Sequence, residues 1–267
     1  MAVLENEEAF LNRIQQGEKI EPTDPMPNEY RENLINLLEM QADSELSGAY
    51  GYIPWIEKAP DIHEKVLVAQ IVKDEVRHAY AINKCLEELG VDVDQRIQAQ
   101  DFAYRIQSGD ANIGAERLAT DKRVNIFYYP IETWTDFIMF NFCMDRGAGH
   151  QLEDALESSY GPWCRAIQSI FKEEVMHMNH GDMWVEKLAQ DPETREETQK
   201  GFEKWFCRTM NIFGRPGSSR NKIYQKWGLK KRDNDAVRES YRKEIEEKAT
   251  RFGLTMPHWT PEYDESV

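Results

Sequence analysis

Two short motifs in the chain place a glutamate three residues before a histidine. Glu75 precedes His78 in the first motif, and Glu174 precedes His177 in the second. Residues three apart on an α-helix project from the same face, so each pair can bind one ion. Carboxylate oxygens and imidazole nitrogens are common ligands of iron and manganese ions. The motifs therefore indicate metal chemistry.

A further carboxylate precedes each motif at nearly the same interval. Glu45 lies 30 residues before Glu75, and Asp145 lies 29 residues before Glu174. One Glu-x-x-His match can arise by chance in a Glu-rich chain, but two with matched upstream acids favour a metal site. Four carboxylates and two histidines form the ligand set of a di-iron or di-manganese site in a four-helix bundle. The predicted metal-binding and catalytic residues are Glu45, Glu75, His78, Asp145, Glu174 and His177.

Capping and turn residues predict where the first two ligand-bearing helices begin and end. The first helix is predicted over residues 28–54, with Pro54 near its end. The second helix is predicted to begin at Asp61, whose carboxylate can cap the first turn, and to end at Gly90. A short loop between them predicts an antiparallel pair.

The second pair repeats this construction. Thr133 can cap a helix that ends near Ser159, and Gly161 begins another that runs to about Gln190. Each of the four acids lies 10 to 14 residues from the helix end that adjoins the loop of its pair. This separation corresponds to roughly 15 to 21 Å along the helix axis. Antiparallel pairing therefore predicts that all six ligands share one level. A further helix is predicted with Asp191 as its cap and Pro192 at its first position, and it runs to about residue 213.

The order of these elements predicts an all-α fold of the ferritin-like class. A long connection over residues 91–132 joins the two helical pairs, as the crossover of ferritin-like bundles does. We predict an N-terminal arm over residues 1–27, a ferritin-like di-iron four-helix bundle over residues 28–190, and a C-terminal helical extension with a basic segment over residues 191–267.

Composition narrows the possible partners and the compartment. The net charge of −15 argues against binding to nucleic acid or to an anionic membrane surface. No apolar run reaches the 18 or more residues of a membrane span, and the acidic N-terminus has no signal-peptide pattern. The four cysteines are far apart and are expected to be buried thiols. We therefore expect a cytoplasmic protein.

One stretch of this acidic chain is strongly basic. Between Glu203 and Asp233 there are nine lysines and arginines and no acid. Arg215, Arg220 and Lys222 flank a Gly- and Ser-rich turn, which predicts an anion site suited to phosphate groups. A docking surface for an acidic partner, or a solvated helix face, would explain the same pattern.

Several segments of the chain resemble catalytic subunits of the bacterial phenylacetyl-CoA epoxidase family. The resemblance covers most of the chain from about residue 28 onward. The segments that carry it are residues 44–48, 74–78, 145–147, 159–163, 172–177, 213–216 and 253–257. Arg77 and Arg146 depart from the expected pattern, and Arg77 makes the first motif similar to other di-iron oxygenases, including benzoyl-CoA epoxidases.

The resemblance implies a ferritin-like monooxygenase that epoxidises the aromatic ring of an aryl-CoA thioester, with phenylacetyl-CoA as the expected substrate. It implies a di-iron centre, dioxygen as co-substrate, and electrons from NAD(P)H through a separate reductase. It also implies a structural subunit of the same fold as partner. The basic segment would then bind the phosphates of coenzyme A. Benzoyl-CoA or another acyl-CoA as substrate, an iron-storage or redox protein, and manganese in place of iron remain alternatives.

Overall fold

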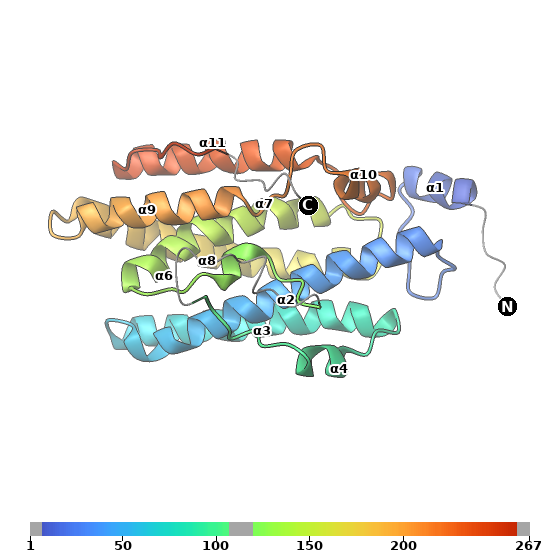
Figure 1. The fold of residues 1–267 in the computed structure, drawn as a ribbon, viewed down its shortest axis with the longest axis horizontal. Helices are drawn as coiled ribbons and strands as arrows, with labels where there is room; N and C mark the ends of the chain where they lie inside the picture. The colour runs from blue at the N-terminus through green and yellow to red at the C-terminus, as the bar shows by residue number, and fades with distance from the viewer. Residues whose placement is uncertain (1–6, 107–119, 261–267) are drawn as a thin grey trace. The chain divides into compact units, whose positions relative to one another are not determined.

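A computed structural model describes residues 7–106 and 120–260 of the chain (Figure 1). Its regular elements are helices, and among these residues the only β-type pairing is an isolated parallel bridge between Ile20 and Tyr160. The predicted all-α fold is therefore confirmed, in agreement with the ferritin-like class. The chain forms two compact units, which we call the first and second units and describe separately.

The first unit comprises Met1–Pro130, Asp154–Ile170 and Ser219–Lys231. Its helices are α1 (Glu7–Gln15), α2 (Asn28–Lys58), α3 (Ile62–Glu88), α4 (Val93–Gln98), the 3-10 turn η1 (Asn125–Tyr128) and α10 (Ser219–Lys226). Figure 1 shows α2 and α3 packed side by side as an antiparallel hairpin. Each helix buries one apolar face, on which Leu34 and Leu38 of α2 and Val68 and Ile71 of α3 are fully buried.

The capping residues that bound α3 are those expected from the sequence. The Asp61 carboxylate accepts hydrogen bonds from the backbone N–H groups of His63 and Glu64. At the other end Gly90 has a φ of 78°, a left-handed conformation that glycine adopts without steric cost. The predicted end of α2 at Pro54 is wrong, because the helix continues through the proline to Lys58.

The reason for this continuation lies in the packing of the last turns of α2. A proline removes one helical hydrogen bond and normally favours a helix end. The side chains of Tyr52 and Trp55 on either side of Pro54 are nevertheless buried, and the Ala59 N–H donates to the Trp55 carbonyl at 2.9 Å. Tertiary burial therefore holds the last turn in helical form.

The second unit comprises Ile131–Glu153, Phe171–Ser218 and Arg232–Val267, so its boundaries fall within two helices. Its elements are α6 (Trp134–Phe140), the π-helical segment η2 (Asn141–Asp145), α7 (Arg146–Ala155), α8 (Gly161–Gln190), α9 (Arg195–Met210) and α11 (Asn234–Phe252). Thr133 caps α6 by accepting from the Asp136 N–H at 3.1 Å, as predicted. The bounds of α8 also agree with the sequence prediction.

The predicted continuous helix over residues 133–159 is interrupted at its centre by η2. A Cβ atom at Gly181 of α8 would lie 2.8 Å from the backbone nitrogen of Phe142 and 3.0 Å from its Cα. The two backbones therefore meet with no room for a side chain. This close approach occurs where the helix widens, and it accounts for glycine at position 181.

The predicted start of α9 at Pro192, after a cap at Asp191, is also wrong, because the helix begins at Arg195. The Asp191 carboxylate accepts from the backbone N–H of Glu193 at 2.9 Å. The carbonyl of Asp191 accepts from Thr194 and Arg195. These bonds close a turn around Asp191, which delays the regular helix by one turn.

A buried arginine links α11 to the π segment. The Arg146 side chain is 2% exposed, and its guanidinium donates to the Phe142 carbonyl, to Asp182 and to Glu244 at 2.6, 2.6 and 2.8 Å. His150 also bonds Glu244, at 2.9 Å. A buried cation is tolerated when its donors are satisfied in this way. Hydrogen bonds from His150 and Arg146 lower the pKa of Glu244 from its ordinary 4.5 to about 2.

Two expectations from composition can be compared with the fold. The four cysteines all lie in the described residues, and none forms a disulfide bond. Cys85, Cys143 and Cys164 are buried, whereas Cys207 is only partly buried, so the expectation of burial is wrong for Cys207. Burial raises the pKa of the Cys85 thiol to about 12. In the described part of the chain, no helix has the length and apolar character needed to cross a membrane.

We predict that Glu244→Gln lowers stability at pH 7 by roughly 1 kcal/mol, a small value because the Glu244 side chain is 40% exposed and solvent screens its bonds. A depressed carboxyl pKa stabilises the fold above the unfolded-state value, here 4.5, and this contribution is lost as the pH falls toward 2. The difference in melting temperature between variant and wild type should therefore shrink below pH 4.5.

Thermal unfolding measured from pH 7 to pH 2 tests this prediction. Glu239→Gln is the control, because Glu239 forms an exposed pair with Arg242 within α11 and should change stability by less than about 0.5 kcal/mol. A destabilisation by Glu244→Gln that is the same at pH 7 and pH 3 would contradict the proposed origin of the effect.

Candidate metal centre

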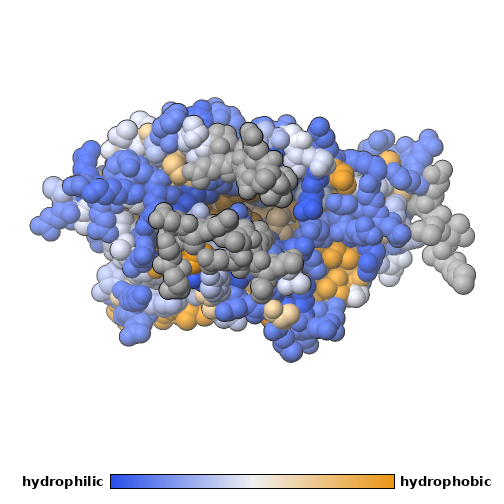
Figure 2. All heavy atoms as spheres, in the orientation of Figure 1, coloured by the Kyte–Doolittle hydropathy of each residue, from blue (hydrophilic) through white to orange (hydrophobic). Residues whose placement is uncertain are grey.

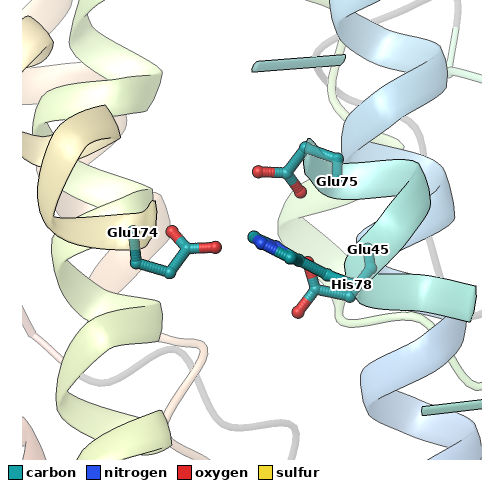
Figure 3. Close-up of side chains that lie close together, drawn as sticks. All are labelled: Glu45, Glu75, His78 and Glu174. Carbon is teal, nitrogen blue, oxygen red and sulfur yellow. The ribbon is translucent and has the colours of Figure 1, made fainter. Parts of the chain in front are cut away.

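Three predicted ligands lie together inside the first unit. Glu45 projects from α2, and Glu75 and His78 project from α3 (Figure 3). One ligand atom from each of these residues lies within 4.8 Å of the others. Their exposed fractions are only 6%, 7% and 1%. We call these residues the first ligand set.

The spacing of three between Glu75 and His78 has the predicted effect, because both side chains leave α3 on the same buried face. The nearest atoms of the His78 ring and the Glu45 carboxylate, Nδ1 and Oε2, are 3.5 Å apart. The Gln41 amide donates to the other oxygen of Glu45, Oε1, at 2.6 Å. One oxygen of Glu45 is thus oriented by an amide while the other faces the histidine.

The other three predicted ligands belong to the second unit. Asp145 is the last residue of η2, and Glu174 and His177 lie on α8; Figure 3 also draws Glu174. All three are buried, with exposed fractions of 5%, 3% and 0%. His177 Nδ1 lies 3.6 Å from Glu174 Oε2, and the Asn141 amide donates to Asp145 Oδ2 at 2.9 Å. Asp145, Glu174 and His177 are the second ligand set.

Two amides that orient the acids were not predicted from the sequence. Gln41 stands four residues before Glu45, and Asn141 stands four residues before Asp145. A spacing of four places both side chains of each pair on one helical face. The same spacing relates Gln70 to Asp74, whose carboxylate accepts from the Gln70 amide at 2.7 Å. An amide four residues before an acid was therefore a signal present in the sequence.

The first ligand set fits a metal ion by its donor chemistry and its burial. Two carboxylates and one imidazole offer the oxygen and nitrogen donors that bind iron and manganese. Moving carboxylates out of water costs several kcal/mol unless a positive charge compensates them. A bound cation would supply that charge.

The remaining histidines have other environments. His63 is exposed in the first turn of α3, and His258 is exposed near the C-terminus. His150 is held by Glu244, as described above, and His180 is buried against the ring of Phe137. None of the four has a carboxylate three residues before it, as the predicted ligands do.

At least three of the nine cations in the basic window form ion pairs with acids in the structure. Lys204 bonds Asp136 at 2.6 Å, Lys226 bonds Glu29 and Glu7, and Arg232 bonds Glu153. These acids come from distant parts of the sequence, so a window that is acid-free along the chain is not acid-free in space. The interpretation of the whole window as one anion site is therefore too broad.

Of the three predicted phosphate-binding residues, two lie on one short helix. Arg220 and Lys222 are exposed on α10, and neither forms an ion pair with any residue in the described ranges. Arg215 is partly exposed and precedes the turn at Gly217, where φ is 64°. Positive φ at Gly214 and Gly217 agrees with the predicted glycine-dependent turn.

Comparison with known proteins identifies the class. Residues 5–266 match the family described as phenylacetic acid catabolic protein, and the chain belongs to that family. It is 28% identical over 257 residues to one of the subunits of 1,2-phenylacetyl-CoA epoxidase from Escherichia coli (strain K12), a match that covers 94% of this chain and 77% of that protein.

A second relative is benzoyl-CoA oxygenase component B from Aromatoleum evansii. Identity to that protein is 25% over 165 residues, or 62% of this chain, and the match spans only 33% of the length of that relative. The family predicted from the sequence is thus confirmed, and the match to the epoxidase protein is the more extensive of the two.

We predict that His78→Ala and His177→Ala each lower the amount of bound iron and abolish the stabilisation that iron confers. Iron at 100 times its dissociation constant would stabilise the wild-type fold by about 2.7 kcal/mol, which corresponds to roughly 5–10 °C in melting temperature. Elemental analysis and thermal unfolding with and without Fe(II) measure both effects.

His63→Ala is the matched control, because it removes an exposed imidazole from the same helix as His78. It should leave metal content and the iron-dependent stabilisation unchanged. Full iron content in both ligand variants would show that the assignment of the ligands is wrong.

Proposed function

We propose that the two ligand sets together bind two iron ions and that the protein is the oxygen-activating subunit of a monooxygenase. The strongest support is the buried group of Glu45, Glu75 and His78, whose ligand atoms lie within 4.8 Å of one another. Glu174 and His177 repeat the same motif on α8, which supports a second metal. The same donors would accept manganese, which is the alternative metal.

Each group of residues has a distinct part in this proposal. The iron pair would supply the activation of dioxygen. The carboxylates and imidazoles would bind the ions, and the amides of Gln41 and Asn141 would hold the acids in fixed orientations. Apolar side chains next to Asn141, including Phe140 and Phe142, are buried and would keep bulk water from the second ligand set.

We propose an aryl-CoA thioester as the substrate and epoxidation of its aromatic ring as the reaction. The extensive similarity to a 1,2-phenylacetyl-CoA epoxidase protein supports phenylacetyl-CoA. Similarity to a benzoyl-CoA oxygenase component supports benzoyl-CoA as the alternative, more weakly because it spans a third of that relative. Both names contain the CoA thioester of an aromatic acid. This substrate class is the more general part of the proposal, and phenylacetyl-CoA is the specific part.

We propose that Arg215, Arg220 and Lys222 bind the phosphates of coenzyme A. Cations that already pair with protein acids, such as Lys226, are poorly placed to bind a phosphate group of the substrate as well. Arg220 and Lys222 are exposed and form no such pair within the described residues, which supports their assignment. Binding at this remote end would orient the thioester without touching its reacting atoms.

A helical partner of the same fold and a separate reductase that draws electrons from NAD(P)H complete the proposed enzyme, which we place in the cytoplasm. The apolar side chains near residue 140 lie in the core of the second unit and so do not support a partner. An exposed apolar stripe on α3 is better support: Ile62, Val66, Val76 and Tyr80 are 47–67% exposed.

These four side chains fall within an arc of about 80° on the helix. Figure 2 shows hydrophobic residues at the surface where Figure 1 draws α3. A packed protein partner would remove this apolar surface from water.

We predict that the chain, reconstituted with its partner and reductase, couples oxygen uptake to oxidation of aryl-CoA thioesters and is most active on phenylacetyl-CoA. Free phenylacetate should be a poor substrate because it lacks the CoA end. Arg215→Ala, Arg220→Ala and Lys222→Ala should each raise KM about tenfold, the effect of losing one charged hydrogen bond. Steady-state kinetics on a panel of thioesters measures these values.

Lys226→Ala serves as control, since its ammonium group is already held by Glu29 and Glu7. A docking role for the basic residues predicts weaker complex assembly with unchanged thioester affinity. Unchanged acyl-CoA binding in all three variants would overturn the CoA assignment, and absence of turnover with every thioester would overturn the proposed reaction.

A further inference from the structure

Gly48 lies in the interior of α2. Glycine is less favourable there than alanine, because its backbone loses more conformational freedom when the helix forms. Its backbone does not require glycine. Six described glycines have positive φ, among them Gly90 and Gly253 at helix ends, and Gly48 is not one of them. A reason other than backbone conformation must account for the missing side chain.

The space beside Gly48 supplies that reason. A Cβ atom at position 48 would lie 3.1 Å from Oε2 of Glu75 and 3.4 Å from Cε1 of Phe127. Ordinary van der Waals contacts of a Cβ atom lie between 3.4 and 4 Å. A methyl group here would therefore be wedged between a carboxylate of the first ligand set and an aromatic ring. One of the two would have to move.

The ring of Phe127 belongs to a segment that is bound to α2 just before Glu45. The Lys122 N–H donates to Asp43 Oδ2 at 3.1 Å, and the Val124 N–H donates to Ser44 Oγ at 3.1 Å. Phe127 itself follows in η1 and is 7% exposed. The segment is thus attached at two successive residues of α2, which limits how far the ring can retreat.

An arginine from the preceding part of the same connection is attached beside Gly48. The Arg105 guanidinium donates to the carbonyl of Ser47 at 2.5 Å. The N–H of Ile106 in turn donates to the carbonyl of Tyr128, the residue after Phe127. Residues 105–106 and 122–128 therefore form one bonded layer over α2, next to the first ligand set.

We propose that Gly48 and Phe127 are positioning residues for the Glu75 carboxylate. Gly48 provides the gap that the carboxylate needs, and the Phe127 ring closes the other side of that gap. The bonded layer fixes the ring, so the gap cannot widen without breaking hydrogen bonds to α2. This inference rests on the proposed metal centre, in which Glu75 is a ligand.

Titration of the full-length metal-free chain with Co(II), monitored by the visible absorption of the bound ion, tests the proposal. Gly48→Ala should weaken Co(II) binding about 10- to 100-fold, the usual effect of disturbing a residue that orients a ligand. It should also shift the absorption bands, because the coordination geometry changes. The melting temperature of the metal-free variant should not fall, since alanine favours the helix.

The double variant Gly48→Ala/Phe127→Leu distinguishes positioning from a general loss of packing. Leucine lacks the Cε1 atom, so the new methyl group can move toward the ring side and leave the carboxylate in place. Co(II) affinity and the absorption bands should return toward those of the wild type. Two independent packing defects would instead add to one another.

Gly201→Ala is the matched steric control. A Cβ atom there would meet Met139 at 3.2 Å and Thr135 at 3.4 Å, nearly the same distances in another helix interior, with no proposed ligand among its neighbours. It should leave Co(II) binding unchanged. Unchanged affinity and bands in Gly48→Ala, or additive losses in the double variant, would overturn the inference. A wild-type chain that binds no Co(II) would overturn the metal centre itself.

Discussion

Burial of carboxylates in a helical core is the constraint on which the site depends. Glu45 and Glu75 are each less than a tenth exposed, as are Asp145 and Glu174. A buried acid without compensation destabilises the fold by several kcal/mol, so such residues persist where a cation or a set of donors offsets the cost. Amides at Gln41 and Asn141 offset part of it. Bound metal ions would offset the rest, which ties the stability of the core to the proposed function.

The residues proposed as ligands are positioned by a different structural feature in each unit. In the first unit a bonded layer from the long connection covers α2 and leaves a gap at Gly48 that a side chain would fill. In the second unit the helix that carries Asp145 widens into a π segment, and the backbone of Gly181 packs directly against it. Arg146 then secures that segment through its bonds to Phe142, Asp182 and Glu244. Both features use glycine where backbone or ligand must approach closely.

The parts of the fold that were predictable depend on local geometry. The Glu-x-x-His spacing and the caps at Asp61 and Thr133 act within one or two helical turns, so they could be inferred from the sequence. Two features depend on tertiary packing and could not be predicted from a local sequence pattern. They are the continuation of α2 through Pro54 and the π segment before Arg146. The pairing of basic residues with distant acids was missed for the same reason, and the acid-free window overstated the anion site.

The proposed function requires that six residues from two similar motifs bind two metal ions. Anomalous diffraction at the iron absorption edge, from crystals of the iron-loaded chain, tests this requirement most directly. We predict two anomalous peaks per chain, with Glu45, Glu75 and His78 among the ligands of the pair and Asp145, Glu174 and His177 completing them. A single peak, or peaks bound by other residues, would contradict the assignment.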